Sequence, residues 1–514
     1  MLAGSLNPAA EPAPFLKCWL VYALEVIAVA VLQFPRNMGL FMFAFGDRGS
    51  WLVVQYLTAH GSRPTIDFGY PYGMLPIMIG SAWFGIFGLT PIAFNLAMTT
   101  GGIAMACGLA RFTTAMRLSP AARALMIVAL PIAIQSSLPS LAHLSEAVLL
   151  CLALGEHSRG NRGAALALAT AACFAKAALA YLYGFLLVIL IVVDCWAYRW
   201  RTAGAGASPR MNWTKLRRTL IPATVTGLLL IAILGSVYGV LPLTASLLPL
   251  NGMKIYATLH FGFFTPWSRT FWDPRGVSMG SYFATVAPFW MGSTLWLALA
   301  GIWAGWRLCS SLREDESSRT RDEIIFCCAV LQTLFVLRIF GPPLSWTYYP
   351  YIVVMGLAAS SLLGTGPAIV AVALTVVAFV AQVVNLGVGA AEWKISAPSP
   401  VTAGLWAHAG ERAEWDTVVH LIAGHRTVAV GVAGGASILF PDFEKPIGAY
   451  LAPAAALPAE AERSIARIKA ADMVVRPASE SIGDPISFWP DLTRTLDHLE
   501  VVWKGRVYQV CRRR

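Results

Sequence analysis

Residues 164–197 read AALALATAACFA, then Lys176, then AALAYLYGFLLVILIVVDCWA. The second of these apolar runs, 177–197, contains a single charged residue, Asp194. An almost uncharged apolar stretch longer than about 18 residues is a candidate membrane-spanning helix. The stretch therefore predicts two membrane helices that meet at a tight break, with a lysine at the break itself.

The composition of the whole chain agrees with a membrane protein. Of the 514 residues, 57% are hydrophobic and only 13% are charged, and the mean hydropathy is +0.63. Soluble domains carry about 25% charged residues. An ordinary cytosolic enzyme, a disordered chain and a disulfide scaffold are therefore excluded. The nine cysteines lack the spacing of a metal site, and we interpret them as structural.

Apolar runs recur along the first three quarters of the chain and predict a polytopic all-α membrane protein with about eleven spanning helices. The predicted spans are Leu16–Phe34, 92–110, 124–140, 141–155, 164–175, 177–197, 219–241, 286–306, 324–341, 348–364 and 368–388. The apolar segment Pro76–Gly88 is too short to span the bilayer. We predict that it is a re-entrant or interfacial helix.

The distribution of charge predicts the orientation. Residues 390–514 hold 14 basic and 14 acidic residues, so the whole net charge of +11 belongs to residues 1–389. There, basic residues gather in alternate loops, whereas the two long intervening loops, 35–91 and 242–285, hold three each. The positive-inside rule then places the N-terminus in the cytoplasm and both long loops and the C-terminal residues outside a plasma (inner) membrane. Because no basic and aromatic stripe is present, we expect no nucleic-acid partner.

The composition changes at about residue 390, which predicts a transmembrane domain over 1–389 and a small soluble α/β domain over 390–514. The predicted helices of the second domain are Trp406–Ala423 and Glu462–Ala470, and its predicted strands are Arg426–Val432, Asp472–Val475 and a terminal hairpin of Glu500–Trp503 with Arg506–Val510. The hairpin turns at Lys504-Gly505.

The first outer loop holds the densest pattern of polar and aromatic residues. It reads GDRGSWL over 46–52 and GSRPTIDFGYPYG over 61–73, directly before the short apolar helix. A carboxylate such as Asp47 is suited to act as a general base on an acceptor hydroxyl or amine. Asp67, Tyr70 and Tyr72 are candidate substrate-binding residues, with the rings stacking on a sugar. In the alternative interpretation, Asp47 caps a helix that begins near Gly49 and the tyrosines belong to an interfacial aromatic belt.

This loop resembles the first outer loop of the GT-C class of membrane glycosyltransferases, which includes protein O-mannosyltransferases and lipid A aminoarabinose transferases. The resemblance implies many membrane helices, juxtamembrane helices and an outer C-terminal domain. It also implies inverting transfer of a hexosyl or pentosyl unit from a polyprenyl-phosphate sugar to a lipid, glycan or protein acceptor. Asp47 matches the catalytic acid of the class by position. Many members carry two adjacent acids there, whereas this chain has Gly46-Asp47-Arg48.

Two cations are candidate ligands for the donor phosphate. Lys176 occupies the break between two predicted helices at the outer side, where the resemblance implies a phosphate ligand, and an ammonium suits that role. Arg338 lies near the outer end of 324–341 and offers a planar fork of donors. The alternatives are a snorkelling lysine and an arginine paired with a neighbouring acid. No cofactor is required by this arrangement, and a divalent cation stays an open alternative.

Three further residues are candidate substrate-binding groups. His143 and Glu146 are spaced i, i+3 and share one helix face, and the resemblance implies an acid near the acceptor at this point. In the alternative interpretation, His143 and Glu146 form a buried pair. A metal site would need a third ligand, and none is visible in the sequence. Arg269 belongs to the aromatic and basic loop 242–285, which suits a cover over an anionic lipid-linked donor or an interfacial loop.

Two functions other than a glycosyltransferase are compatible with this sequence. A transporter or flippase of lipid-linked sugars is one, although such proteins tend to be built from related halves and no internal repeat is visible here. A non-catalytic subunit for envelope assembly is the other.

Overall fold

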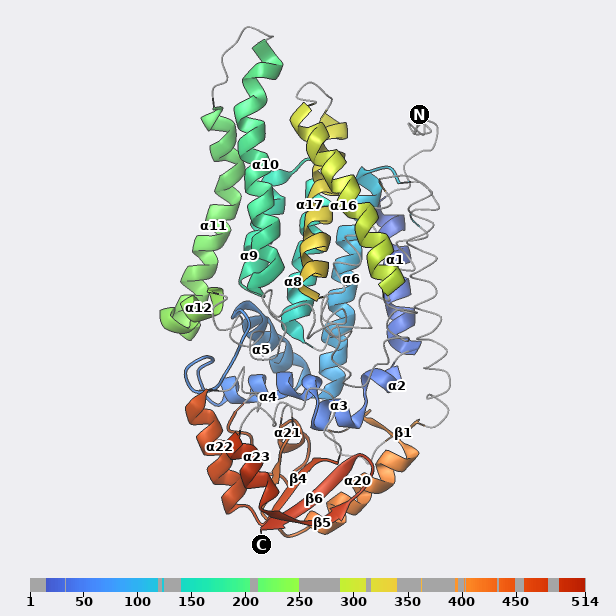
Figure 1. Cartoon of the computed structure of the whole chain (residues 1–514), viewed down its shortest axis with the longest axis vertical. Coiled ribbons are helices and arrows are strands. Elements are labelled where there is room, and N and C mark those ends of the chain that lie inside the picture. The colour runs from blue at the N-terminus through green and yellow to red at the C-terminus, as the bar shows by residue number, and fades with distance from the viewer. Residues whose placement is uncertain are drawn as a thin grey trace.

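The computed structural model describes residues 15–118 except residue 33, 140–203, 211–248, 287–310, 316–339, 404–431, 434–448, 457–478 and 490–513, with residues 123, 362, 393–395 and 402 between them. It is mostly helical, with a small sheet near the C-terminus. Figure 1 shows a bundle of long helices in one half of the molecule and the C-terminal residues packed across one end of that bundle.

Eight helices of the bundle coincide with predicted spans. They are α1 (Phe15–Leu32), α6 (Pro91–Ala115), α8 (Leu141–Ser158), α9 (Arg162–Cys173), α10 (Ala177–Ala203), α11 (Trp213–Tyr238), α16 (Ala287–Ser310) and α17 (Glu316–Ile339). The predicted spans 124–140, 348–364 and 368–388 lie almost wholly outside the described residues. The total of eleven therefore stays a prediction.

Within the described residues, three helices are long and apolar enough to cross a membrane by length and composition: Pro91–Ala115, Leu179–Trp196 and Trp213–Tyr238. The last of these is only 11% buried, so most of its apolar surface suits contact with lipid. In contrast, α9 has 12 residues and a length of about 18 Å. It is therefore too short to cross a hydrocarbon core of about 30 Å by itself.

The chain alternates between the two ends of the bundle. The last turns of α10 and α16 and the first turns of α1, α11 and α17 lie at the end far from the C-terminal residues (Figure 1). The α9–α10 break and the last turn of α17 lie at the near end. This alternation is the one that the charge pattern predicts for loops of opposite sides. Which end faces the cytoplasm stays a prediction.

A buried ionic network joins five helices at the far end. Arg162 of α9 binds Glu323 of α17 through two guanidinium nitrogens, each at 2.8 Å, and binds Asp194 of α10 at 3.0 Å. Arg319 of α17 contacts the same two acids at 3.0 and 3.3 Å. Lys215 of α11 and His157 of α8 complete the network, at 2.8 Å from Asp194 and 3.3 Å from Glu323. Arg162 and Arg319 are thus structural counter-ions of the two buried acids.

We expect Glu323→Gln to destabilise the protein by about 3–5 kcal/mol, because it removes a fully buried anion and leaves two buried guanidinium groups with less compensation. Thermal unfolding of the detergent-solubilised protein measures this effect as a lower Tm. Asp491→Asn is the matched control, since its ion pair with Arg494 is 71–73% exposed and is worth at most about 1 kcal/mol. Equal Tm values for the two variants would contradict a supporting role for the network.

Four short helices lie between the bundle and the C-terminal residues. They are α2 (Phe34–Asn37), α3 (Leu40–Ala44), α4 (Asp47–Ala59) and α5 (Leu75–Phe87). Figure 1 shows α4 lying across the end of the bundle rather than along it. The thirteen-residue α5 agrees with the prediction of a short helix over Pro76–Gly88. An eight-residue helix, α12 (Val240–Leu247), follows α11 at the same end.

The C-terminal residues contain most of the elements predicted there. A four-stranded sheet has the order β3-β4-β6-β5, with β3 and β4 parallel and the other pairs antiparallel. Its strands are β3 (Thr427–Ala429), β4 (Met473–Pro477), β5 (Leu499–Lys504) and β6 (Tyr508–Arg513), and the last two form the predicted hairpin. The helices are α20 (Ala409–Ile422), α21 (Ala436–Leu439), α22 (Pro458–Ala470) and α23 (Pro490–Asp497). Trp406–His408, predicted as the start of a helix, is strand β2, which pairs with β1 (Trp393–Ile395).

One hydrophobic core runs from the bundle into the C-terminal residues. Phe45, at the end of α3, lies 5.5 Å from the ring of Tyr508 in β6 and 6.1 Å from that of Trp415 in α20. Glu411 accepts hydrogen bonds from the Phe41 backbone N–H at 3.1 Å and from the Tyr508 hydroxyl at 2.7 Å. The C-terminal residues therefore help to position α3 and α4, and the domain boundary at 389/390 stays a prediction.

Candidate functional site

Asp47 is the first residue of α4. Gly46 is the N-cap and makes no side-chain capping bond, so the alternative in which Asp47 caps a helix starting near Gly49 is wrong. A carboxylate in the first turn is favourable because the positive end of the helix dipole lies there. Asp47 is partly exposed. The backbone of Gly435 packs so closely against α3 that a Cβ there would lie 1.9 Å from the carbonyl oxygen of Phe43.

The first outer loop donates backbone hydrogen bonds to the break between α9 and α10 that carries Lys176. Helix α9 ends at Cys173 and α10 begins at Ala177, which leaves carbonyl groups of the turn without a helical partner. The backbone N–H of Gly73 donates to Ala175 O at 3.0 Å, and that of Leu75 donates to Phe174 O at 3.1 Å. Only glycine fits at 73, because a Cβ would lie 1.9 Å from Phe174 O. The YPYG sequence and the lysine break are thus one structural unit.

Lys176 is buried, and two neutral groups contact its ammonium. Its Nζ lies 2.6 Å from Nε2 of His143 and 5.8 Å from the centre of the Tyr72 ring. Because a lysine ammonium only donates, Nε2 is the acceptor and the imidazole proton lies on Nδ1, which faces the hydroxyl of Ser140. That hydroxyl also accepts from the His143 backbone N–H at 3.2 Å and caps α8. The cap, the histidine and the lysine therefore form one chain of hydrogen bonds.

Aromatic rings of the first outer loop form a wall beside this lysine. Tyr72 stacks on Trp51 of α4 with ring centres 6.2 Å apart, and Tyr70 meets both rings edge-on at 6.0 and 5.8 Å. Trp51 is fully buried, and its indole N–H has no hydrogen-bond partner among the described residues. Asp47 and Trp51 are spaced i, i+4, which places them on the same face of α4, one turn apart. The ring contacts thus run from Lys176 through Tyr72 to Trp51 of α4, the helix that begins at Asp47.

Two of the remaining predicted residues lie in different environments. Glu146 is fully buried in α8, one turn after His143, as the i, i+3 spacing predicts. Asp67 closes an exposed turn, where it accepts from the Arg63 backbone N–H at 2.7 Å and from its guanidinium at 3.2 Å. These hydrogen bonds lower the pKa of Asp67, so it is ionised at neutral pH. Its contacts are local to the turn, and a role in substrate binding stays a prediction.

Of the two predicted arginines, Arg338 belongs to a described helix. Arg338 lies in the last turn of α17, at the same end of the bundle as α4 and the Lys176 break (Figure 1). Its side chain is outside the described part of the chain. Arg269 and the loop around it also lie outside the described residues. Within the described residues, no group of three or more metal-ligating side chains is present.

Glu460 of α22 reaches from the C-terminal residues into the first outer loop. Its fully buried carboxylate accepts from the Gly69 backbone N–H at 2.7 Å, and it also accepts from the backbone N–H of Leu457 at 3.1 Å. Nearby, Arg463 donates to the carbonyl oxygen of Asp67 at 2.7 Å. The sequence around Glu460 indicates only a helix start. Its contact with a residue 391 positions away is visible only in the structure.

We expect Glu460→Ala to loosen the loop segment that carries Tyr70 and Tyr72, because the Gly69 N–H would stay buried without an acceptor, at a cost of about 1–3 kcal/mol. Limited proteolysis within residues 61–74 measures this as faster cleavage. Glu460→Gln keeps an acceptor oxygen and should restore much of the protection, and the exposed neighbour Glu462→Ala should have no effect. Unchanged cleavage in Glu460→Ala would refute the proposed anchor.

Comparisons with known proteins give a weak structural likeness. No family model and no curated protein matches this chain. Two solved structures are similar to it, both of ArnT from Cupriavidus metallidurans. The one bound to undecaprenyl phosphate has 13% identity and a TM-score of 0.35, and covers 95% of this chain and 97% of ArnT. The one in the apo state has 14% identity and a TM-score of 0.32, and covers 97% and 98%. Likeness at this level does not assign a family or a ligand.

Proposed function

We propose that this chain is an integral membrane glycosyltransferase that moves a sugar from a polyprenyl-phosphate donor to a lipid, glycan or protein acceptor. One observation carries the proposal. The ammonium of Lys176 is buried at a helix break, is contacted by His143 at 2.6 Å, and lies beside an aromatic wall that continues into the helix headed by Asp47. An ammonium with three donors suits a lipid phosphate, and a carboxylate suits activation of an acceptor.

The reaction is a single displacement. Asp47 takes the proton from the acceptor hydroxyl or amine, and the acceptor atom attacks the anomeric carbon of the donor sugar. The bond between that carbon and the phosphate oxygen breaks, and its electron pair stays on the departing polyprenyl phosphate. Lys176, with Arg338, stabilises the charge that develops there. Attack on the side opposite the leaving group inverts the anomeric configuration.

The position of these groups supports this assignment. Helix α4, the Lys176 break and the last turn of α17 with Arg338 all lie at one end of the bundle (Figure 1). The resemblance of residues 46–88 to the first outer loop of GT-C transferases points to the same residues. The positive-inside rule makes this end the outer face of the plasma membrane.

The aromatic wall suits the sugar itself. Tyr72 lies beside the lysine with Trp51 and Tyr70 packed against it, and the buried indole N–H of Trp51 is a donor for a sugar hydroxyl. The proximity of Tyr72 to Lys176 lets the sugar and the phosphate of one donor bind side by side.

The full-length protein in nanodiscs, supplied with a radiolabelled polyprenyl-phosphate sugar, tests the proposal. We expect release of polyprenyl phosphate together with a labelled acceptor of inverted anomeric configuration. Movement of the labelled lipid across vesicles without any transfer would instead favour a flippase. Undecaprenyl phosphate, the lipid of the ArnT crystal, serves as a binding probe that does not depend on the identity of the sugar.

A further inference from the structure

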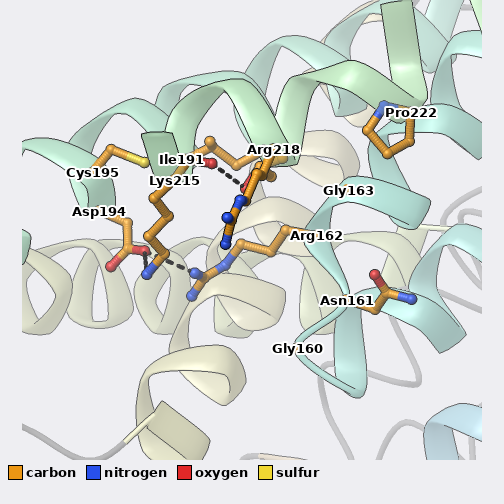
Figure 2. A pocket seen from close by; sticks show the side chains of 11 residues that line it. Gly160, Asn161, Arg162, Gly163, Ile191, Asp194, Cys195, Lys215, Arg218 and Pro222 are labelled. Atoms are coloured by element: carbon orange, nitrogen blue, oxygen red, sulfur yellow. Dashed lines mark hydrogen bonds and ion pairs between the residues drawn. The ribbon is translucent and has the colours of Figure 1, made fainter. Parts of the chain in front are cut away.

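A second polar site lies at the far end of the bundle, away from the C-terminal residues. It is a pocket of about 240 Å³ between the start of α9, residues 191–195 of α10 and the first turns of α11. Figure 2 shows Arg162, Asp194 and Lys215 pointing toward one another there, with Arg218 alongside. The glycosyltransferase chemistry proposed above makes no use of this site.

The pocket carries an excess of positive charge. Arg162, Lys215 and Arg218 line it together with one acid, Asp194, and the buried Glu323 behind it compensates Arg162 at 2.8 Å. Asp194 is bound by Arg162 at 3.0 Å and by Lys215 at 2.8 Å. Arg218 is exposed, and neither of these two ion pairs includes it. The lining is therefore suited to an anion that would add contacts to Arg218 and balance the remaining charge.

The N-terminus of α9 also favours an anion in the pocket. The N-cap residue, Asn161, makes no side-chain capping bond, and it lines the pocket with Arg162 and Gly163. The positive end of a helix dipole and the N–H groups of the first turn favour an anion at such a position. Cationic side chains from α9 and α11 thus face the same space as a helix N-terminus.

Exposed tryptophans beside the pocket support a position at the depth of lipid headgroups. Trp196 and Trp213, on the helices that form it, are 46% and 61% exposed, and exposed tryptophans on membrane proteins concentrate at the interface between lipid and water. The backbone N–H of Asn212 donates to Cys195 O at 3.1 Å, which holds the start of α11 against α10. The volume is below the roughly 300 Å³ of small-molecule sites, so it suits a headgroup whose chains stay in the bilayer.

We propose that this pocket binds the phosphate of an anionic phospholipid headgroup. Arg218 supplies the outer contact, and Arg162 and Lys215 supply the positive field behind it. Free inorganic phosphate shares this chemistry, but it lacks acyl chains that would remain in the adjoining lipid. The site therefore ties α9, α10 and α11 to the lipid leaflet at that end.

Native mass spectrometry of the full-length protein released from phosphatidylcholine nanodiscs, with and without phosphatidylglycerol, tests the proposal. We expect Arg218→Ala to weaken retention of phosphatidylglycerol about tenfold, the equivalent of one charge-assisted hydrogen bond. Arg217→Ala is the matched control, because Arg217 is the adjacent exposed arginine and does not line the pocket. It should leave retention unchanged.

Two results would overturn the proposal. Equal losses in Arg217→Ala and Arg218→Ala would mean that diffuse surface charge retains the lipid. A second arm titrates inorganic phosphate into phosphatidylcholine nanodiscs and follows the Tm. A rise in Tm that depends on Arg218, without retention of phosphatidylglycerol, would identify a soluble phosphate as the ligand instead. Retention that depends on Arg218, with no response to inorganic phosphate, supports the lipid.

Discussion

Replacing Asp47 with asparagine is expected to lower the rate of sugar transfer about 10²–10⁴-fold, the usual contribution of a general base. The amide has nearly the same shape as the carboxylate and cannot take the acceptor proton. Asp47 is the first residue of α4 and is partly exposed, so the variant should fold, with a loss of at most about 1 kcal/mol from the helix dipole. Transfer of a radiolabelled sugar by the purified protein in nanodiscs measures the effect.

Measuring donor binding by the Asp47→Asn variant distinguishes a loss of catalysis from a loss of folding. Because Asp47 acts on the acceptor, Asp47→Asn should bind undecaprenyl phosphate as tightly as the unchanged protein. Asp416→Asn is the control for charge alone, since Asp416 is an exposed acid of α20, and it should transfer at the normal rate. Full transfer by Asp47→Asn would remove this residue from the mechanism.

Replacing Lys176 with methionine is expected to weaken binding of undecaprenyl phosphate about 10–100-fold, because a hydrogen bond to a charged group is worth about 1.5–3 kcal/mol. The transfer rate should fall further, about 10²–10³-fold in total, since the lysine also stabilises charge that develops only during the reaction. Methionine keeps an unbranched apolar stem at the helix break, so the packing around Tyr72 and His143 is largely retained.

Three further variants test whether the role of Lys176 is electrostatic. Lys17→Met removes an exposed lysine of α1 and should leave both binding and transfer unchanged. His143→Ala removes the group that contacts the ammonium at 2.6 Å and should weaken binding less than Lys176→Met, because the charge remains. His143→Gln, which offers an acceptor oxygen, should recover part of that loss. Normal donor binding in Lys176→Met would overturn the assignment of the phosphate site.

A transporter of lipid-linked sugars would also use a buried lysine, but it would not depend on Asp47 as a base. The two functions therefore differ in the Asp47→Asn variant. A transferase loses its chemistry and keeps the donor, whereas a transporter keeps moving the lipid. Lys176→Met would impair a transferase and a transporter alike. Asp47 is therefore the residue whose substitution distinguishes the two functions.

The sequence predicted the helices well because their signals are local. Eight apolar runs became helices of the bundle, and Pro76–Gly88 became the short helix α5. The terminal hairpin around Lys504-Gly505 also follows from neighbouring residues. The prediction of where α4 starts was less accurate. Whether Gly46 or Asp47 is the N-cap depends on backbone geometry within one or two residues.

The sequence by itself determined the class of the protein, the positions of most helices and the break at Lys176, because apolar length and charge are properties of contiguous residues. Only the tertiary structure brought Tyr72, His143 and Lys176 together, seated Gly73 against the break, and joined Glu460 to a residue 391 positions away. The buried ionic network of Arg162 and Glu323 likewise could not be predicted from any pattern in the sequence. Such contacts depend on which helices pack side by side, and no local periodicity encodes that choice.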